Sequence, residues 1–141
     1  MAIKQAFMKQ VRGITFVGKT DSGHWITIDG PENFYGSNAG IRPKELLLLS
    51  LAGCTGSDVV AILQKKRVPL NGFEINITAE QSDEHPQVYT KINIEYLFYG
   101  KSLNTNDLER AIELSQTKYC SISAMLKKAV EITHSYKVVE N

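Results

Sequence analysis

The sequence predicts a single α+β domain over residues 1–141, with its elements in the order βββ-α-ββ-αα-β. Three observations predict this class: strand-like segments fill the first thirty residues, one long apolar helical run follows Pro43, and alternating segments return between residues 73 and 98. Hydrophobic residues make up 43% and charged residues 22%, which is typical of a globular protein and excludes a largely disordered chain.

The N-terminal segment is predicted to form an antiparallel meander of three strands. Ile3, Phe7 and Val11 fall on odd positions among polar residues, Gly13 interrupts the pattern, and residues 14–17 resume it. The run 21–23 (Asp-Ser-Gly) is a turn sequence, and residues 25–28 form the third strand. The following loop, 30–42, is rich in Gly, Asn and Pro and is longer than most connections, which makes it a candidate functional segment.

A long helix is predicted from Pro43 to about Lys66, because proline is favoured at the first helical position. Leucines at 46–49 and 51 cover nearly every direction around it, so the helix should be buried on all sides. A domain of this size has difficulty surrounding such a helix alone, and a second subunit is the simplest source of cover. The most apolar stretch is too short to span a bilayer and Asp58 lies near it, so we predict no membrane segment.

The C-terminal half is predicted to contain a hairpin, two helices and a last strand. Strict alternation over 73–80 and 88–98 predicts two strands with one solvent-exposed face. The sheet around the long helix is predicted to be antiparallel. Asn106, with an acidic residue three positions later, is typical of a helix start. Further helical and strand patterns cover 122–130 and 132–138.

Charge and cysteine content narrow the class of function. The formal net charge is +1, which argues against a nucleic-acid-binding protein that depends on phosphate contacts. The N-terminus lacks the long apolar core of a signal peptide, and two cysteines cannot form a disulfide framework. We therefore expect a reduced, cytoplasmic protein.

The two cysteines are the candidate reactive groups. Cys120 follows Lys118 near a helix start, which favours the thiolate, whereas Ser50 and Asp58, four residues either side of Cys54, are not cations. By this local test Cys120 is the better activated thiol, although each cysteine alone also fits a small apolar core residue. Metal ligands usually lie at close spacing, and no metal is predicted because these residues are far apart in the sequence: Cys54, Cys120, His24, His85 and His134.

Three blocks of the sequence resemble the OsmC/Ohr family, more closely its small bacterial OsmC-like branch than the organic hydroperoxide resistance enzymes. Residues 42–60 (RPKELLLLSLAGCTGSDVV) resemble the family's central helix, and 110–121 (RAIELSQTKYCS) its second cysteine region. The tail segment 132–136 fits the same branch. The resemblance implies an intertwined homodimer with the long helix at its centre and sites between the subunits.

The resemblance also implies a thiol peroxidase that acts on organic hydroperoxides without a cofactor. Cys54 matches the peroxidatic cysteine, which forms a sulfenic acid, and Cys120 matches the resolving cysteine, which closes a disulfide. An external dithiol, in some members a lipoylated protein, completes the cycle. The hydroperoxidases carry a glutamate directly after the helix-opening proline, where this chain has Lys44, and Arg12 does not match the flanks of the family arginine. We therefore predict slower peroxide turnover than in a dedicated hydroperoxidase.

Two other functions fit the same sequence. The first is a small-molecule binding protein that keeps the dimer fold but performs little chemistry, and Lys44 favours it. The second is a thiol redox sensor, in which oxidation of Cys54 and Cys120 changes a partner interaction. The sequence leaves these alternatives open.

Overall fold

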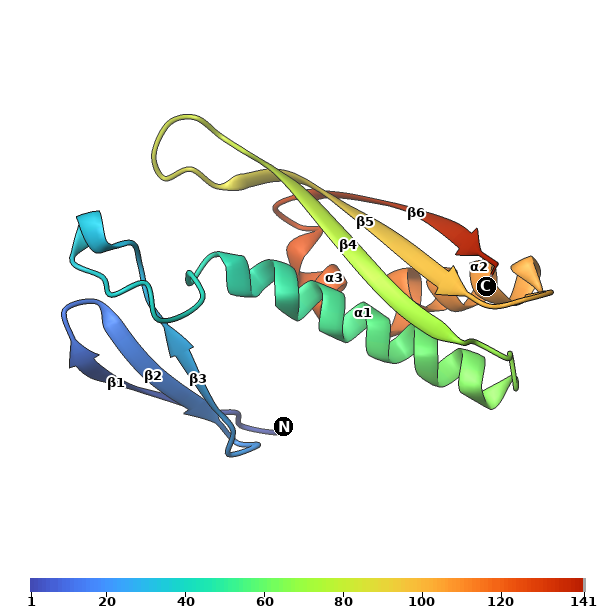
Figure 1. Cartoon of the computed structure of the whole chain (residues 1–141), viewed down its shortest axis with the longest axis horizontal. Helices are drawn as coiled ribbons and strands as arrows, with labels where there is room; N and C mark the ends of the chain where they lie inside the picture. The colour runs from blue at the N-terminus through green and yellow to red at the C-terminus, as the bar shows by residue number, and fades with distance from the viewer. Residues whose placement is uncertain (141) are drawn as a thin grey trace. The chain divides into compact units, whose positions relative to one another are not determined.

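The structure is a computed structural model that describes residues 1–140 (Figure 1). Its elements follow the predicted order, with a short 3-10 turn before the first helix and a π-helical segment after the second. They are β1 (Ala6–Arg12), β2 (Thr15–Thr20), β3 (Trp25–Ile28), η1 (Glu32–Phe34), α1 (Glu45–Lys65), β4 (Gly72–Gln81), β5 (Tyr89–Tyr99), α2 (Thr105–Leu114), η2 (Ser115–Tyr119), α3 (Ser121–Leu126) and β6 (Glu131–Val139). The chain divides into two compact units, Met1–Leu47 and the remainder from Leu48.

The first unit is the predicted meander, in which β1, β2 and β3 pair antiparallel in that order. Strand β1 is exposed along its whole length. No hydrophobic side chain in Met1–Leu47, a unit that the structure describes completely, is fully buried. The sheet of this unit therefore has apolar residues but no core of its own within one chain.

Asp29 organises the loop that follows β3. Its buried carboxylate accepts hydrogen bonds from Thr15 Oγ1 at 2.8 Å and from the backbone N–H groups of Gly30 at 2.8 Å and Ala39 at 3.0 Å. Burial raises the pKa of Asp29, but these hydrogen bonds and one from Ser37 outweigh it and lower the pKa to about 2. A single carboxylate thus ties the long loop to the meander.

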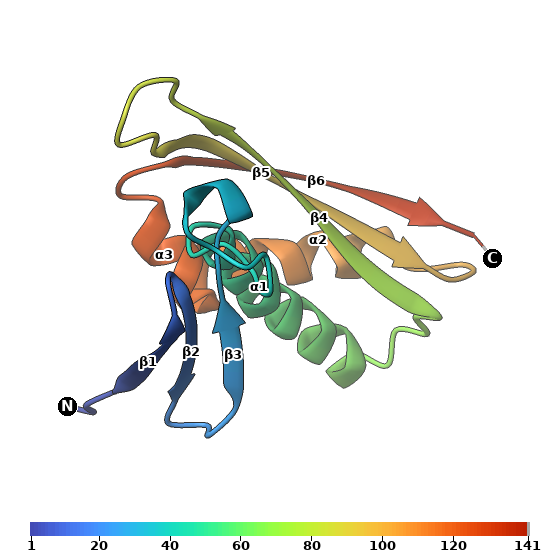
Figure 2. The ribbon, with the colours of Figure 1, turned by 60° about the vertical axis from the view of Figure 1, so that its left-hand side comes forward.

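The second unit packs its helices on one face of the sheet β4-β5-β6 (Figures 1 and 2). Helix α1 buries one side chain per turn against this sheet: Leu51, Thr55, Val59 and Leu63. The centre of the core comes from alternate residues of the middle strand β5, which are almost completely buried: Ile92, Ile94, Tyr96 and Phe98. The apolar face of α2 completes the core.

Strand β6 differs from the predicted antiparallel sheet. The β4–β5 hairpin is antiparallel as predicted, whereas β6 pairs parallel to β5, with Ile94 opposite His134. A parallel neighbour requires a crossover connection, and α2 and α3 provide it by returning the chain to the starting end of β5 (Figure 2). The alternating pattern of residues 132–138 predicts a strand but carries no information about its direction.

Helix α1 also differs from its prediction, because within one chain it is buried on one face rather than on all sides. Leu47 is 44% exposed and Leu49 is 59% exposed. The helix is long and apolar enough to cross a membrane by length and composition. Its completely buried residues pack on the sheet, and we therefore interpret α1 as a core helix whose outer face is uncovered in the single chain.

The helix start predicted at Asn106 lies two residues too late. The N-cap of α2 is Asn104, whose side chain accepts hydrogen bonds from the backbone N–H groups of Asn106 at 3.0 Å and Asp107 at 3.4 Å. Helix α3 ends at Leu126, earlier than predicted, because residues 127–129 form a turn.

Candidate functional site

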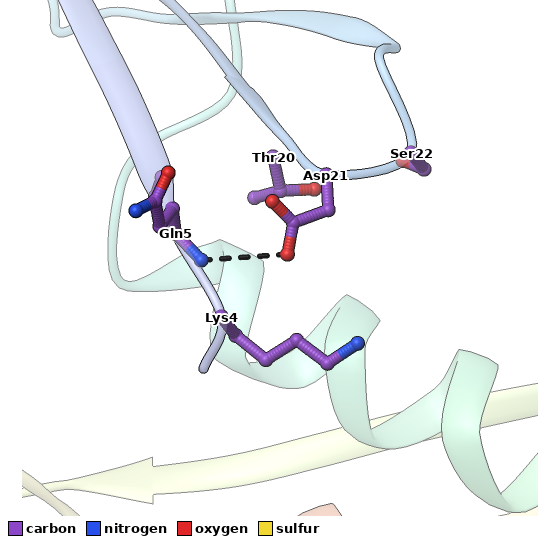
Figure 3. Close-up of a pocket in the computed structure, with 6 residues that line it drawn as sticks. Lys4, Gln5, Thr20, Asp21 and Ser22 are labelled. Atoms are coloured by element: carbon purple, nitrogen blue, oxygen red, sulfur yellow. Dashed lines mark hydrogen bonds between the residues drawn. The ribbon is translucent and has the colours of Figure 1, made fainter. Parts of the chain in front are cut away.

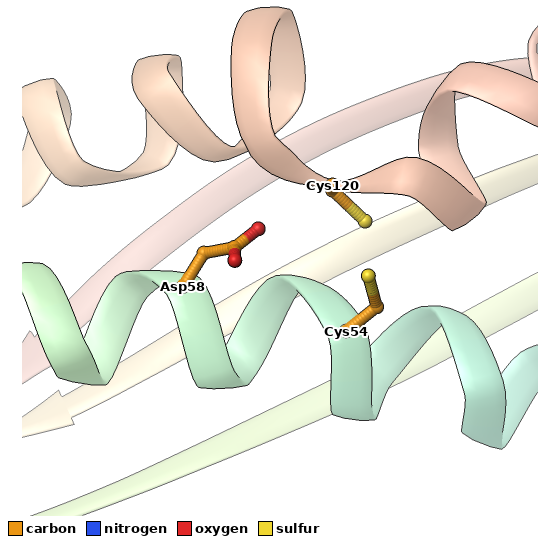
Figure 4. Close-up of side chains that lie close together, drawn as sticks. All are labelled: Cys54, Asp58 and Cys120. Atoms are coloured by element: carbon orange, nitrogen blue, oxygen red, sulfur yellow. The ribbon is translucent and has the colours of Figure 1, made fainter. Parts of the chain in front are cut away.

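The two cysteines, 66 residues apart in the sequence, come together on the inner side of α1. Cys54 projects from the middle of α1, and Cys120 lies at the N-cap of α3. Their sulfur atoms and a carboxylate oxygen of Asp58 all lie within 4.8 Å of one another (Figure 4). All three residues belong to the second unit.

A π-helical turn positions Cys120. After Leu114 the chain forms the wide π-helical segment Ser115–Tyr119. The Cys120 N–H closes this segment by donating to the Ser115 carbonyl at 2.8 Å. Cys120 Sγ then caps α3 by accepting a hydrogen bond from the Ser123 N–H at 3.4 Å. Such single-turn π segments are frequent at functional sites. Cys120 is almost completely buried there.

Cys54 is the more easily ionised thiol of the pair. Burial raises its pKa, but hydrogen bonds from the Ile122 N–H, the Cys120 thiol and Ser121 outweigh burial and lower the pKa below its ordinary value. The Ser121 hydroxyl lies 3.8 Å from Cys54 Sγ. The largest lowering contributions therefore come from neutral donors at the start of α3, which is a different element from the one that carries Cys54.

Cys120 has the opposite shift. Burial raises the pKa of the Cys120 thiol, and the neighbouring Cys54 raises it further, although Ser123 lowers it in part. Lys118, the residue that favoured Cys120 in the sequence, has its ammonium group 5.2 Å from the ring centre of Tyr119. The local expectation that Cys120 is the better activated thiol is therefore wrong, because the decisive donors act on Cys54 through space.

A buried network of polar side chains lies next to the thiols. Thr55 Oγ1, completely buried on α1, lies 2.6 Å from Tyr96 OH and 2.7 Å from Ser115 Oγ. Gln116 Nε2 donates to Thr55 Oγ1 at 3.1 Å and to Tyr96 OH at 3.2 Å. Gln116 Oε1 in turn accepts from Ser123 Oγ at 3.0 Å. The network joins α1 and β5 to the segment on either side of Cys120.

Tyr96 stays protonated in this network. Burial raises the pKa of its hydroxyl to about 12, against the lowering effect of the hydrogen bonds from Thr55 and Gln116. Electrostatic interaction with Cys120 and Asp58 raises the pKa of Tyr96 further. At neutral pH Tyr96 is therefore a fixed neutral partner that holds the other hydroxyl groups in place.

Asp58 was noted in the sequence as a non-cationic neighbour of Cys54, but its place in the site was missed. It lies one helical turn after Cys54, is half-buried, and accepts a hydrogen bond from Ser115 Oγ at 2.9 Å through Oδ2. Its spacing of four residues from Cys54 places both side chains on one face of α1, and that spacing is the signal in the sequence that could have found it. The metal-ligand candidates predicted from the sequence were cysteine and histidine residues, and Asp58 was not among them.

Two charged residues of the first unit, Glu45 and Arg12, have local partners. Glu45 Oε1 accepts a hydrogen bond from the Arg42 N–H at 2.9 Å, so this carboxylate caps the start of α1. The Arg12 guanidinium donates to Ser37 Oγ at 3.3 and 3.2 Å. Both contacts organise the loop before the helix.

The first unit also contains an open depression, shown in Figure 3. It is lined mostly by polar and charged residues near the start of the chain and the end of β2: Lys4, Gln5, Ala6, Thr20, Asp21 and Ser22. The Gln5 N–H donates to Asp21 Oδ2 at 3.4 Å across it. The lining includes neither cysteine, so we place the candidate site at the thiol pair instead.

Comparison with known proteins identifies the chain's sequence family and shows solved structures with the same fold. The sequence model of the family described as OsmC-like protein matches residues 36–135. Protein YhfA of Escherichia coli is 43% identical over 138 residues, which cover 96% of this chain and 98% of that protein. A crystal structure of a hypothetical protein from Aquifex aeolicus has 35% identity and a TM-score of 0.86, covering 100% of this chain and 99% of the other.

A more distant solved structure shares the fold. It is described as an organic hydroperoxide resistance protein OsmC from Legionella pneumophila and has a TM-score of 0.70 at 15% identity, with 98% of each chain covered. At that identity the likeness concerns the fold alone. The α+β class and the order of elements predicted from the sequence are confirmed by this agreement.

Proposed function

The chain belongs to the OsmC-like protein family, and we propose that it is a cysteine-based peroxidase that reduces organic hydroperoxides in the cytoplasm. The observation that carries the proposal is the pair of thiols within 4.8 Å, of which Cys54 has a lowered pKa and Cys120 a raised one. A peroxidase of this type needs one thiolate to attack and one protected thiol to resolve. The name of the Legionella structure supports a hydroperoxide as the substrate.

In the proposed cycle the Cys54 thiolate attacks the O–O bond of the hydroperoxide. One oxygen is transferred to sulfur as a sulfenic acid, and the other leaves as an alkoxide that takes a proton to become the alcohol. Cys120 then attacks the sulfenic sulfur, its proton leaves with the hydroxyl group as water, and the disulfide closes. An external dithiol reduces this disulfide by exchange, and we propose a lipoylated protein as a candidate reductant. No bound cofactor takes part in this scheme.

We further propose that a second copy of the chain completes the fold as a homodimer. The first unit exposes large apolar side chains on its strands: Phe7, Met8, Val11 and Trp25. Leu47 and Leu49 are exposed at the start of α1. Exposed apolar surface of this extent is typical of an interface between subunits. Sedimentation of the purified protein should give twice the chain mass, and a monomer at micromolar concentration would contradict the dimer.

The decisive experiment follows cumene hydroperoxide consumption with an excess of dithiol. Cys54→Ser should abolish turnover, whereas Cys120→Ser should consume one equivalent and then stall or become over-oxidised. Ser57→Ala, on the exposed face of α1, is the control variant and should keep parental turnover. If both cysteine variants consume peroxide like the parent, the proposed peroxidase function is wrong.

A second candidate function, small-molecule binding, is favoured by an apolar cavity in the first unit. The cavity has a volume of about 310 Å³, which lies within the range of ligand sites, and Phe7, Met8, Ile26, Ile28 and Leu46 contribute to its lining. Native mass spectrometry tests this candidate, because a bound small molecule would persist in the Cys54→Ser variant. Absence of any bound molecule, together with peroxide turnover, would favour the peroxidase.

A further inference from the structure

We propose that the reduced protein binds a thiophilic divalent cation, Zn²⁺, through Cys54, Asp58 and Cys120. The metal and the Cys54–Cys120 disulfide are then mutually exclusive states of one site. Zn²⁺ binding itself does not depend on peroxide reduction, whereas metal release by a hydroperoxide rests on the proposed function.

The donor set suits zinc. Zn²⁺ takes thiolate sulfur at about 2.3 Å and carboxylate oxygen at about 2.0–2.2 Å in a tetrahedral arrangement. That geometry places neighbouring ligand atoms about 3.5–3.8 Å apart. The three donor atoms already lie within 4.8 Å of one another (Figure 4), so a closure of about 1 Å brings them into tetrahedral contact. Two sulfur donors select against Mg²⁺ and Ca²⁺, which prefer oxygen.

Two helices hold the three ligands in place. Cys54 and Asp58 lie one turn apart on α1, and Cys120 faces them from the N-cap of α3. Ser115 Oγ donates to Asp58 Oδ2 at 2.9 Å, and we assign Oδ1 to the metal. Ser115 Oγ also lies 2.7 Å from Thr55 Oγ1, so the buried network orients the carboxylate. Hydrogen bonds of this kind are the usual second layer of a metal site.

Charge and access also favour a cation. Two thiolates and one carboxylate carry a formal charge of about −3, which a divalent ion reduces to about −1. Cys54 is half-buried, so the site remains open on the side of this residue. Three protein ligands leave a fourth position for water, as in zinc sites that exchange ligands rather than in closed structural sites.

Oxidation would release the metal. Disulfide formation removes the negative charge of both thiolates, and because a neutral disulfide is a poor ligand for Zn²⁺, Asp58 remains as the single strong ligand. Two metal-bound thiolates, one hydroperoxide and two protons give one disulfide, one alcohol, one water and free Zn²⁺, so the sulfurs lose two electrons and the O–O bond gains them. The bound metal would in turn keep Cys54 from attacking peroxide, because its sulfur is already coordinated.

The test begins with Co²⁺ as a spectroscopic probe for the zinc site. Reduced protein, freed of reductant and titrated with Co²⁺ without peroxide, should show thiolate-to-cobalt charge transfer with an intensity for two sulfurs and a stoichiometry of one per chain. Zn²⁺ should displace the Co²⁺ and remove the absorption. Absence of the charge-transfer band in the wild-type protein would overturn the proposal without recourse to variants.

Variants assign the ligands. Cys54→Ser and Cys120→Ser should each halve the thiolate band, and Asp58→Asn should keep the band intensity per bound ion but weaken Zn²⁺ affinity. Ser115→Ala, which removes the orienting hydrogen bond, should weaken affinity about 10–100-fold. Asp107→Asn on α2 is the control and should bind like the parent. Parental affinity in Asp58→Asn would overturn the assignment of this carboxylate.

The outcomes separate this inference from the peroxidase. Metal binding without hydroperoxide consumption would refute the proposed function and leave the metal site intact. Hydroperoxide consumption without metal binding would refute the metal site alone. If both hold, one equivalent of hydroperoxide should release the bound Zn²⁺, as measured with a chromogenic chelator, and retention of the metal by the oxidised protein would refute mutual exclusion.

Discussion

Replacement of Thr55 by valine tests whether the buried polar network fixes the helix of Cys54 to the segment of Cys120. Thr55 Oγ1 has three partners, Tyr96 OH at 2.6 Å, Ser115 Oγ at 2.7 Å and Gln116 Nε2 at 3.1 Å. Valine keeps the shape of the side chain, so the change removes hydrogen bonds and creates almost no cavity.

The expected loss in the free energy of unfolding follows from the hydrogen bonds that the three partners of Thr55 retain. Tyr96 OH and Gln116 Nε2 still bond each other at 3.2 Å, and Ser115 Oγ still donates to Asp58. Because each partner keeps one bond, the loss in the free energy of unfolding should be about 1–3 kcal/mol, the cost of partly unsatisfied buried polar groups. For a chain of 141 residues this lowers Tm by about 2–12 °C.

The assay is urea denaturation followed by circular dichroism, at equal protein concentration for every variant. Ser57→Ala serves as the control, since the Ser57 hydroxyl is exposed and bonds only locally, to the Gly53 carbonyl at 2.7 Å. This control should change stability by less than about 0.5 kcal/mol. A Thr55→Val variant as stable as the control would refute the view that the network joins the two elements.

Three further predictions concern ionisation and helix capping. Iodoacetamide should modify Cys54 faster than Cys120 at neutral pH, as read by peptide mass spectrometry, because the Cys54 pKa is lowered and the Cys120 pKa raised; equal rates would contradict this. The pKa of Asp29 falls from 3.8 to about 2 on folding, so its stabilisation is complete above pH 3.8 and is lost as the pH falls towards 2. Asp29→Asn should be less stable at neutral pH and lose this part of the acid dependence in urea titrations, and an unchanged acid profile would count against it. Asn104→Ala should destabilise the protein by about 1 kcal/mol in the same assay, and Asn106→Ala by clearly less; the reverse order would place the cap at Asn106.

Much of the fold could be predicted from the sequence, because periodicity reports which face of an element is apolar. The strands at 73–80 and 88–98 and the helix from Pro43 all form close to their predicted bounds. The parallel pairing of β6 could not be predicted, because alternation is the same in either strand direction. The true helix cap at Asn104 was missed because Asn106 is the same residue type and has glutamate, the residue typical of a capping box, three positions later, whereas Asn104 has Asp107 there.

The candidate site, too, could be predicted only in part from the sequence. The resemblance to a family singled out Cys54 and Cys120, but their relative acidity depends on donors from Ser121 and Ile122 that reach Cys54 across a gap between elements. The residues next to each cysteine in the sequence do not reveal such contacts. The prediction from these neighbours therefore chose the wrong thiol as the more acidic one. Asp58 needed only its helical spacing from Cys54, yet its role as a possible ligand depends on the fold that brings Cys120 beside it.

The wide turn at Ser115–Tyr119 makes the reactive geometry sensitive to chain length. Each residue of an α-helix advances the chain by about 100° of rotation, so loss of one residue here would let the helix continue regularly and turn the next side chains away by about that angle. Thr117 is exposed, and its deletion would change the direction of Cys120 while leaving the strands beneath it intact. A one-residue insertion or deletion in a homologue at this point would therefore separate the two thiols without disturbing the core, and such a homologue would keep the scaffold without the proposed disulfide chemistry.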